Sequence, residues 1–301
     1  MSYLSTLTTD AAFARYEAVR GRLPETAFPA RSDHLKSLAE VADRVDAFVL
    51  DAFGVLNVGQ TPIPGAVERM AQLRAMGKKL VVLTNAASDT RAAALRKYHR
   101  LGFDFSADEV VASRDVCAAR LDTHLTTGRW GAISTEIDTF ADFDADVVRW
   151  TAQTQPQVDG FLILSSAAMD TATYTALRYA LTDQARPLLV ANPDIVAPRE
   201  TGLSCEPGFF AHQLADEAGI APHFFGKPFG NAFDDVKKKL SGIAPDRIAM
   251  VGDTLHTDIL GARAAGLKSV LITSFGLFAG CDVTPYINRS GIVPDIICPI
   301  T

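Results

Sequence analysis

Three aspartates stand at or just beyond the ends of short apolar runs. Asp51 ends the run AFVLD, and both Asp253 and Asp258 lie in GDTLHTD, which follows the run RIAMV. Neighbouring carboxylates raise each other's pKa unless a cation compensates them, and a hard divalent ion is the natural compensation. Each acid also has a structural explanation, because Asp51 could be a turn residue and Asp258 could cap the next helix. Their coincidence at separate strand ends favours a shared site.

Two further segments carry groups that suit a phosphate. The run KLVVLTN ends at Thr84 and Asn85, whose side chains can hydrogen-bond anionic oxygens. Lys227 lies in FFGKPFG, where glycine, proline and phenylalanine neighbours favour a partly buried lysine over the more usual solvated one. A buried ammonium needs an anion, and a phosphate or a nucleophilic carboxylate would provide it.

The elements that must position these groups are short strands alternating with helices. Strands are expected at 47–51, 79–85, 247–253 and 269–273, and their near-continuous apolarity is typical of a parallel sheet covered on both faces. Ligands of such sheets bind outside the carboxyl ends of the strands, which is where the candidate residues fall. Two helices are expected between the strands, one starting at Pro64 and ending at Gly77, the other capped by Ser88 and ending at Gly102.

The chain divides into three parts by pattern. Residues 126–220 hold their own strand-like runs and a helical segment, which predicts a smaller α/β domain inserted into the first. Residues 45–125 and 221–301 would form the core domain, and residues 1–44 an N-terminal helical extension.

Composition excludes several functional classes. The chain is 301 residues long, 48% hydrophobic and 21% charged, with a net charge of -6. A mildly acidic surface argues against nucleic-acid and anionic-membrane partners. Four scattered cysteines show no metal spacing, and neither a signal peptide nor a membrane-spanning run is recognisable, so we expect a cytoplasmic protein with reduced thiols.

In their order along the chain, DAFGVL, LTNAAS, GKP and GDTLHTD resemble the motifs of the haloacid dehalogenase (HAD) superfamily of phosphohydrolases. Only 33 residues separate Asp51 from Thr84, whereas 143 separate Thr84 from Lys227, so an inserted cap fits only in the second interval. That placement resembles the class IIA, C2-capped branch with its NagD-like and p-nitrophenyl-phosphatase-like enzymes. The resemblance implies a Rossmann-like HAD core with an inserted α/β cap, and family analogy implies a homodimer through the cap.

The resemblance also implies a role for each motif residue in hydrolysing a small phosphorylated substrate, such as a sugar phosphate or a nucleotide-like ester. Asp51 would attack phosphorus and form an aspartyl-phosphate, and Lys227 would offset the negative charge. Mg²⁺ would be held by Asp51, the backbone carbonyl of Phe53 and Asp253, with Asp258 supporting its waters. Other residues would bind the phosphate or the substrate: Thr84, Asn85, Ala52, Gly54, Asn192 and Asp194.

Phe53 departs from the pattern of this superfamily. Most of its phosphatases carry a second Asp at this position, which protonates the leaving group and then activates water. Phe53 cannot transfer a proton, and the nearest titratable candidate in the motifs is His256, for which a surface or helix-entry position is the more ordinary reading. Two alternatives stay open: a weak or silent protein that binds a phosphorylated ligand, and a metal-independent 2-haloacid dehalogenase, because DAFG is similar to the DAYG of those enzymes. The dehalogenase reading is opposed by the short first interval and by the metal-type acid pair.

Overall fold

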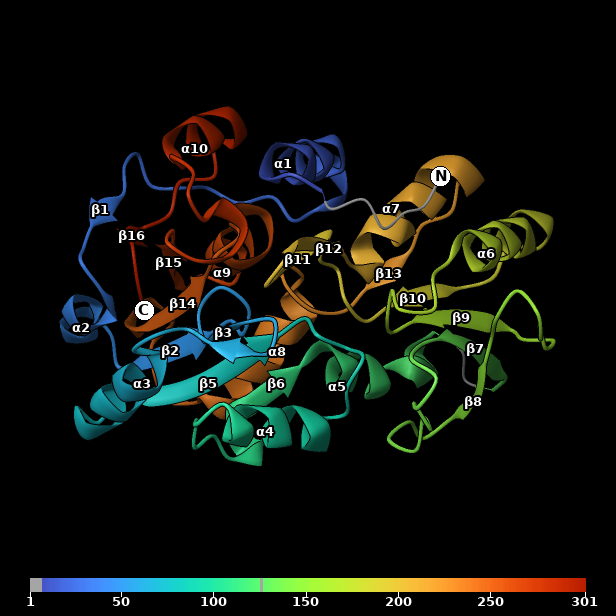
Figure 1. Cartoon of the computed structure of the whole chain (residues 1–301), viewed down its shortest axis with the longest axis horizontal. Helices are drawn as coiled ribbons and strands as arrows, with labels where there is room; N and C mark the ends of the chain where they lie inside the picture. The colour runs from blue at the N-terminus through green and yellow to red at the C-terminus, as the bar shows by residue number, and fades with distance from the viewer. Residues whose placement is uncertain (1–6, 125–126) are drawn as a thin grey trace.

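The computed structural model describes residues 7–124 and 127–301, and its central element is a seven-stranded parallel sheet (Figure 1). Its strands, in spatial order, are β1 (Asp33–His34), β16 (Ile296–Cys298), β15 (Lys268–Ile272), β14 (Ile248–Gly252), β2 (Ala47–Leu50), β5 (Lys79–Thr84) and β6 (Val110–Ala112). All neighbouring pairs are parallel, and the four strands expected from the sequence are present. The α/β fold class is therefore confirmed.

Helices cover both faces of this sheet. Alternate residues of β2 point to opposite sides, so that Ala47 and Val49 join a cluster with the helices α5 (Ser113–Ala118) and α8 (Gly230–Lys239). Phe48 and Leu50 join the opposite cluster with the helices α2 (Leu38–Val41), α3 (Ala66–Ala75) and α4 (Arg91–Arg100). Burial on both faces explains the continuous apolar runs of the strands.

Two predicted helix starts are wrong for local reasons. Pro64 does not begin α3: the N–H of Ala66 donates to the carbonyl of Ile63, and Gly65 has φ +80°, which is a type II turn with proline and glycine at its centre. Ser88 does not cap α4, because the Thr90 hydroxyl accepts from the N–H of Ala93 and the helix begins at Arg91. Both helices end close to the predicted glycines.

A second, five-stranded sheet lies beside the first, at the right of Figure 1. Its spatial order is β13 (His223–Phe224), β10 (Leu188–Val190), β9 (Gly160–Ile163), β7 (Arg129–Ile133) and β8 (Asp146–Arg149). One face packs on the helices α6 (Thr171–Asp183) and α7 (Pro207–Ala218), and the other contributes Trp130 and Leu162 to the cluster around α5 and α8. The strand β13 lies beyond residue 220, so the second sheet extends past the expected end of the insertion.

Three smaller elements connect the two sheets. The hairpin of β11 (Val196–Arg199) and β12 (Gly202–Cys205) lies between them in Figure 1, and a short hairpin of β3 (Asn57–Val58) and β4 (Thr61–Pro62) follows β2. The helix α1 (Thr9–Ala18) lies near α7 and α10 (Thr284–Ser290), contacting the second domain through Asp216 and the first through Tyr286.

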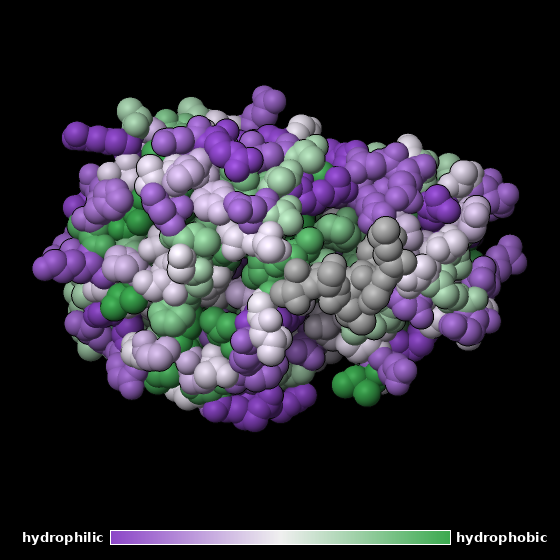
Figure 2. All heavy atoms as spheres, turned by 45° about the horizontal axis from the view of Figure 1, so that its top comes forward, coloured by the Kyte–Doolittle hydropathy of each residue, from purple (hydrophilic) through white to green (hydrophobic). Residues whose placement is uncertain are grey.

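Hydrophilic side chains dominate the face drawn in Figure 2, with hydrophobic residues in small separate groups. Among the described residues, no helix has the length and apolar character that crossing a membrane requires.

Candidate active site

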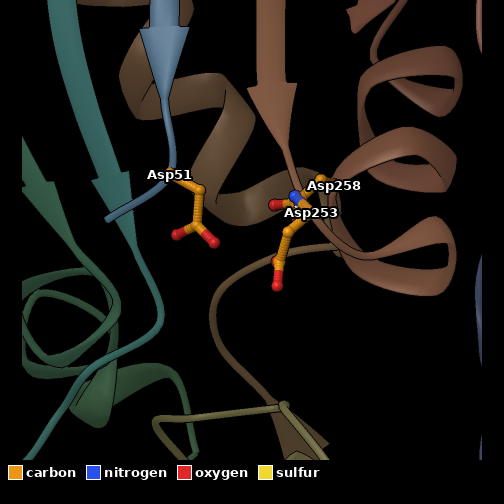
Figure 3. A group of neighbouring side chains, drawn as sticks. All are labelled: Asp51, Asp253 and Asp258. Carbon is orange, nitrogen blue, oxygen red and sulfur yellow. Dashed lines mark hydrogen bonds between the residues drawn. The ribbon is translucent and has the colours of Figure 1, made fainter. Parts of the chain in front are cut away.

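The three predicted aspartates converge at the carboxyl ends of two neighbouring strands. Asp51 follows β2 and Asp253 follows β14, which pairs with β2, so the sheet itself brings them together. In Figure 3 the Asp51 carboxylate points toward Asp253, and Asp258 lies beside Asp253 at the start of the next helical segment. One carboxylate oxygen from each residue lies within 4.8 Å of the others, and all three residues are buried.

Lys227 is the cation in this cluster. Its side chain is 1% exposed, and its Nζ lies 2.5 Å from Asp51 Oδ1 and 2.7 Å from Asp258 Oδ1. Burial alone would lower the pKa of Lys227, but Asp258 and Asp51 outweigh it and raise that pKa, so the ammonium stays charged. Burial raises the pKa of Asp51 to about 7, with Lys227 opposing part of the effect.

Asp253 sits in a cradle that only glycine permits. Its Oδ2 accepts from the N–H of Leu277 at 2.7 Å, and its Oδ1 accepts from the Thr254 hydroxyl at 3.0 Å. A Cβ on Gly54 would lie 2.8 Å from Asp253 Oδ2, and one on Gly276 would lie 2.0 Å from it. The two glycines therefore allow the Asp253 side chain to pack directly against their backbone, in the position where it faces Asp51.

Asp258 is held as a supporting group. Its Oδ2 accepts from the N–H groups of Asp253 and Thr254, at 3.1 and 3.0 Å, while its Oδ1 faces Lys227. Burial and the two other aspartates raise the pKa of Asp253 well above its usual value, while the ammonium of Lys227 contacts Asp51 and Asp258. This excess of buried oxygen ligands fits a hard divalent cation such as Mg²⁺.

Thr84 and Asn85 are buried at the end of β5, the other neighbour of β2. The amide of Asn85 is fully engaged: its Oδ1 accepts from the N–H of Lys227 at 2.8 Å, and its Nδ2 donates to the Lys227 carbonyl at 2.9 Å and to Asp194 Oδ1 at 2.8 Å. In this arrangement the Asn85 side chain positions Lys227 rather than facing a phosphate. Asp194 is thereby tied through Asn85 to Lys227, and burial raises the pKa of Asp194.

The other predicted ligand-binding groups also have protein partners. The N–H of Ala52 donates to Asp51 Oδ1 at 2.7 Å, and the N–H of Gly54 donates to the carbonyl of Asn57 at 2.9 Å. The side chain of Asn192 donates to Glu206 at 3.1 Å and accepts from the N–H of Asp194 at 2.9 Å. Asn192 therefore shapes the loop that presents Asp194.

A cavity of about 100 Å³ adjoins this cluster, where the two domains and the hairpin of β11 and β12 meet. Phe53 and Asp194 line it, together with Ser165 from the end of β9. The two cations that line it, Lys97 of α4 and Arg199 of β11, were not predicted from the sequence. Lys97 reads as one more cation of a surface helix, and Arg199 lies in what the sequence presents as a loop, so neither has a local signal.

His256 lies at a helix entry, in the helical turn Leu255–Ile259, which is one of the two ordinary positions expected for it, but it does not lie at the surface. The residue is fully buried, stacks on Tyr16 of α1 with ring centroids 5.0 Å apart, and its Nε2 contacts Glu17 at 2.5 Å. Burial lowers the pKa of His256. Its side chain packs against the N-terminal helix and is not among the residues that line the cavity.

Comparisons with known proteins agree with this arrangement. The family description "Haloacid dehalogenase-like hydrolase" matches residues 48–141, and a related HAD-hydrolase-like description matches residues 224–297. The chain is 30% identical over 290 residues to human glycerol-3-phosphate phosphatase, covering 86% of this chain and 89% of that one.

Two solved structures extend the likeness over both domains. A "possible sugar phosphatase" of the HAD superfamily from Cytophaga hutchinsonii superposes with a TM-score of 0.78 at 25% identity, covering 89% of this chain and 98% of that one. The glycerol phosphate phosphatase from Mycobacterium tuberculosis in complex with magnesium superposes with a TM-score of 0.64 at 26% identity. The match covers 78% of this chain and 69% of that one. The chain thus belongs to the haloacid dehalogenase superfamily, and within it to the class IIA, C2-capped phosphatases.

Proposed function

We propose that this protein hydrolyses a small phosphate monoester with the help of Mg²⁺, through an aspartyl-phosphate on Asp51. The observation that carries the proposal is the contact of Asp51 with Lys227, beside Asp253, at the carboxyl end of β2. Burial raises the pKa of Asp51 to about 7, and contact with the Lys227 ammonium opposes part of that rise, so the nucleophilic carboxylate form is favoured above about pH 7.

The residues support a two-step reaction. A carboxylate oxygen of Asp51 attacks phosphorus, the bond from phosphorus to the ester oxygen breaks, and the departing oxygen takes a proton from water. A second water then attacks phosphorus, the bond to Asp51 breaks, and inorganic phosphate leaves with the carboxylate restored. The ammonium of Lys227 offsets negative charge in both steps, and Thr84 lies at the adjoining strand end.

The metal would be held by Asp51, Asp253 and the backbone carbonyl of Phe53, with Asp258 positioning the group. Bound there, Mg²⁺ would offset charge on the phosphoryl oxygens. The cradle of Gly54 and Gly276 supports this assignment, because it allows the Asp253 carboxylate to lie within 4.8 Å of carboxylate oxygens of Asp51 and Asp258.

Because Phe53 cannot donate a proton, we expect the rate of turnover to depend strongly on the leaving group of the ester. General acid–base help is typically worth about 10²–10⁴-fold in rate, and Phe53 supplies none. We therefore expect slow turnover, or turnover that favours esters whose leaving oxygen needs little protonation. A silent phospho-ligand binder remains the second candidate for the same reason. The dehalogenase reading is disfavoured, because only the hairpin of β3 and β4 and the helix α3 lie between β2 and β5.

The cavity favours compact substrates among the sugar phosphates and nucleotide-like esters expected from the sequence. Its volume of about 100 Å³ is well below the roughly 300 Å³ at which sites for drug-sized ligands begin. Glycerol-3-phosphate phosphatases recur among the relatives, and a three-carbon ester suits this volume. A homodimer through the cap and a cytoplasmic location, which suits the free cysteines, are further proposals.

The test is a steady-state assay with p-nitrophenyl phosphate, glycerol 3-phosphate and a panel of sugar and nucleotide phosphates, with Mg²⁺ or with EDTA. We expect Mg²⁺-dependent release of phosphate that Asp51→Asn abolishes and that Asp246→Asn, at an exposed acid, leaves unchanged. Tight binding of esters without turnover would favour the silent binder. Metal-independent release of halide from 2-chloropropionate would favour the dehalogenase.

A further inference from the structure

Two cations contact the ring of Phe53 at the cavity wall. Lys97 Nζ lies 4.7 Å from the ring centroid, and the guanidinium carbon of Arg199 lies 4.7 Å from the same centroid. The lysine comes from α4 of the core and the arginine from β11, which follows the second domain. Contact with an aromatic face attracts a cation, but it neutralises no charge.

Carboxylates only partly compensate this pair. Among the residues that the structure describes, Lys97 has no ion-pair partner: Asp89 and Glu200, which influence it, are both exposed, and Glu200 accepts hydrogen bonds from Gln60 and Thr61 instead.

Arg199 does have a partner in Glu206, which its Nη2 contacts at 2.8 Å. That carboxylate, which also lines the cavity, accepts from the Ser204 hydroxyl at 2.6 Å and from Asn192 at 3.1 Å, so its oxygens already have partners. The ammonium of Lys97 and the remaining edge of the Arg199 guanidinium are thus left for the cavity. Burial and the nearby Arg199 lower the pKa of Lys97 to about 8, as expected for a half-buried lysine without an anion.

Lys97 and Arg199 line a cavity that is linked by a chain of contacts to the proposed nucleophile, Asp51. Asp51 contacts Lys227, whose backbone bonds Asn85, and Asn85 bonds Asp194, which lines the same cavity as Phe53. An ester with its phosphorus at Asp51 would extend its other end into this small space. An acid at position 53 could pair with a cation here, whereas phenylalanine neutralises neither of them, so Lys97 keeps its charge without an ion-pair partner among the described residues.

We infer that Lys97 and Arg199 form a subsite for a carboxylate at the far end of a short phosphate ester. A carboxylate is the compact anion that suits a cavity of this volume, and both cations can donate charge-assisted hydrogen bonds to it. The inference rests on the proposed phosphatase function and narrows its substrates to phosphorylated short-chain acids.

The test compares two esters of equal length, 3-phosphoglycerate with its carboxylate and glycerol 3-phosphate with a hydroxymethyl group in its place. Charge-assisted hydrogen bonds predict a kcat/KM about 10- to 100-fold higher for 3-phosphoglycerate in the wild type. Lys97→Met should bring the ratio of the two kcat/KM values close to one by raising KM for 3-phosphoglycerate. Lys97→Arg should keep most of the preference, and Arg199→Gln should lower it. The control is Arg96→Met, an exposed cation one residue earlier on α4, which should leave the ratio unchanged.

The outcomes distinguish a failure of the proposed subsite from a failure of the proposed phosphatase function. Hydrolysis of both esters without preference, or an equal loss on both in Lys97→Met, would overturn the subsite and leave the phosphatase function standing. Absence of all turnover would overturn the function instead. Calorimetric titration of each ester would then decide the subsite, which equal affinities would exclude.

Discussion

The sharpest consequence of the site concerns Lys227, which holds two buried carboxylates with one ammonium. Lys227→Met keeps much of the length of the side chain and removes the charge, leaving Asp51 and Asp258 uncompensated in a site where Lys227 is 1% exposed. Breaking a buried ion pair by deleting one partner costs about 3–5 kcal/mol, which is a large share of a typical unfolding free energy of about 5–15 kcal/mol.

The cost should depend on pH, since the stranded carboxylates can take up protons. Burial already raises the pKa of Asp51 to about 7, and loss of Lys227 raises it further. At pH 5 Asp51 is protonated in the variant, so the loss of unfolding free energy is reduced. At pH 8 the buried Asp51 either ionises without a partner or stays protonated above the pKa of the unfolded state, and the full loss is expected.

Urea denaturation in EDTA at the two pH values measures this difference, with Lys239→Met as the control at an exposed lysine. We expect Lys227→Met to lose about 3–5 kcal/mol at pH 8 and clearly less at pH 5, with Lys239→Met close to the wild type at both. A loss below about 1 kcal/mol at pH 8, or an equal loss at both pH values, would refute the reasoning.

Three further predictions follow from the same site. Gly276→Ala places a Cβ 2.0 Å from Asp253 Oδ2 and should weaken Mg²⁺ binding at least tenfold in calorimetric titration, while Gly280→Ala, at a similar φ of +77° with open space around it, should not. The folded pKa of Asp51 lies above its unfolded value of about 3.9, so the metal-free protein should lose stability as pH rises from about 4 to about 7; scanning calorimetry in EDTA should show a fall in Tm that Asp51→Asn reduces. Phe53→Asp restores an acid opposite Lys97 and Arg199, so it should raise kcat on glycerol 3-phosphate and lower the preference for 3-phosphoglycerate; an unchanged kcat would show that the missing acid does not limit the rate.

Most of the core was predictable because its signals are local. Continuous apolar runs predict β2, β5 and β14. Because ligands bind at the carboxyl ends of parallel strands, the sequence also predicts that Asp51 and Asp253 lie close together. The lysine followed from its unusual apolar neighbours. In each case a few adjacent residues carry the information.

What could not be predicted depends on distant partners. The strand β1 has two residues and is defined only by its pairing with β16, more than 260 positions away. The side-chain amide of Asn85 hydrogen-bonds Lys227 and Asp194, and no sequence pattern around Asn85 predicts these partners. Lys97 and Arg199 become neighbours only when the hairpin of β11 and β12 folds over the ring of Phe53.

The helix α1 imposes an order on the assembly of this chain. Tyr16 accepts from the N–H of Ile195, Glu17 contacts His256 and Asp10 accepts from Tyr286, so its partners lie 179 to 276 residues further on. At the usual synthesis rate of about 5–20 residues per second, α1 is made roughly 10–50 s before the residues that it contacts. This helix therefore docks well after its own synthesis, and its apolar face, with Phe13 and Tyr16, is exposed to chaperones and to neighbouring chains in the meantime.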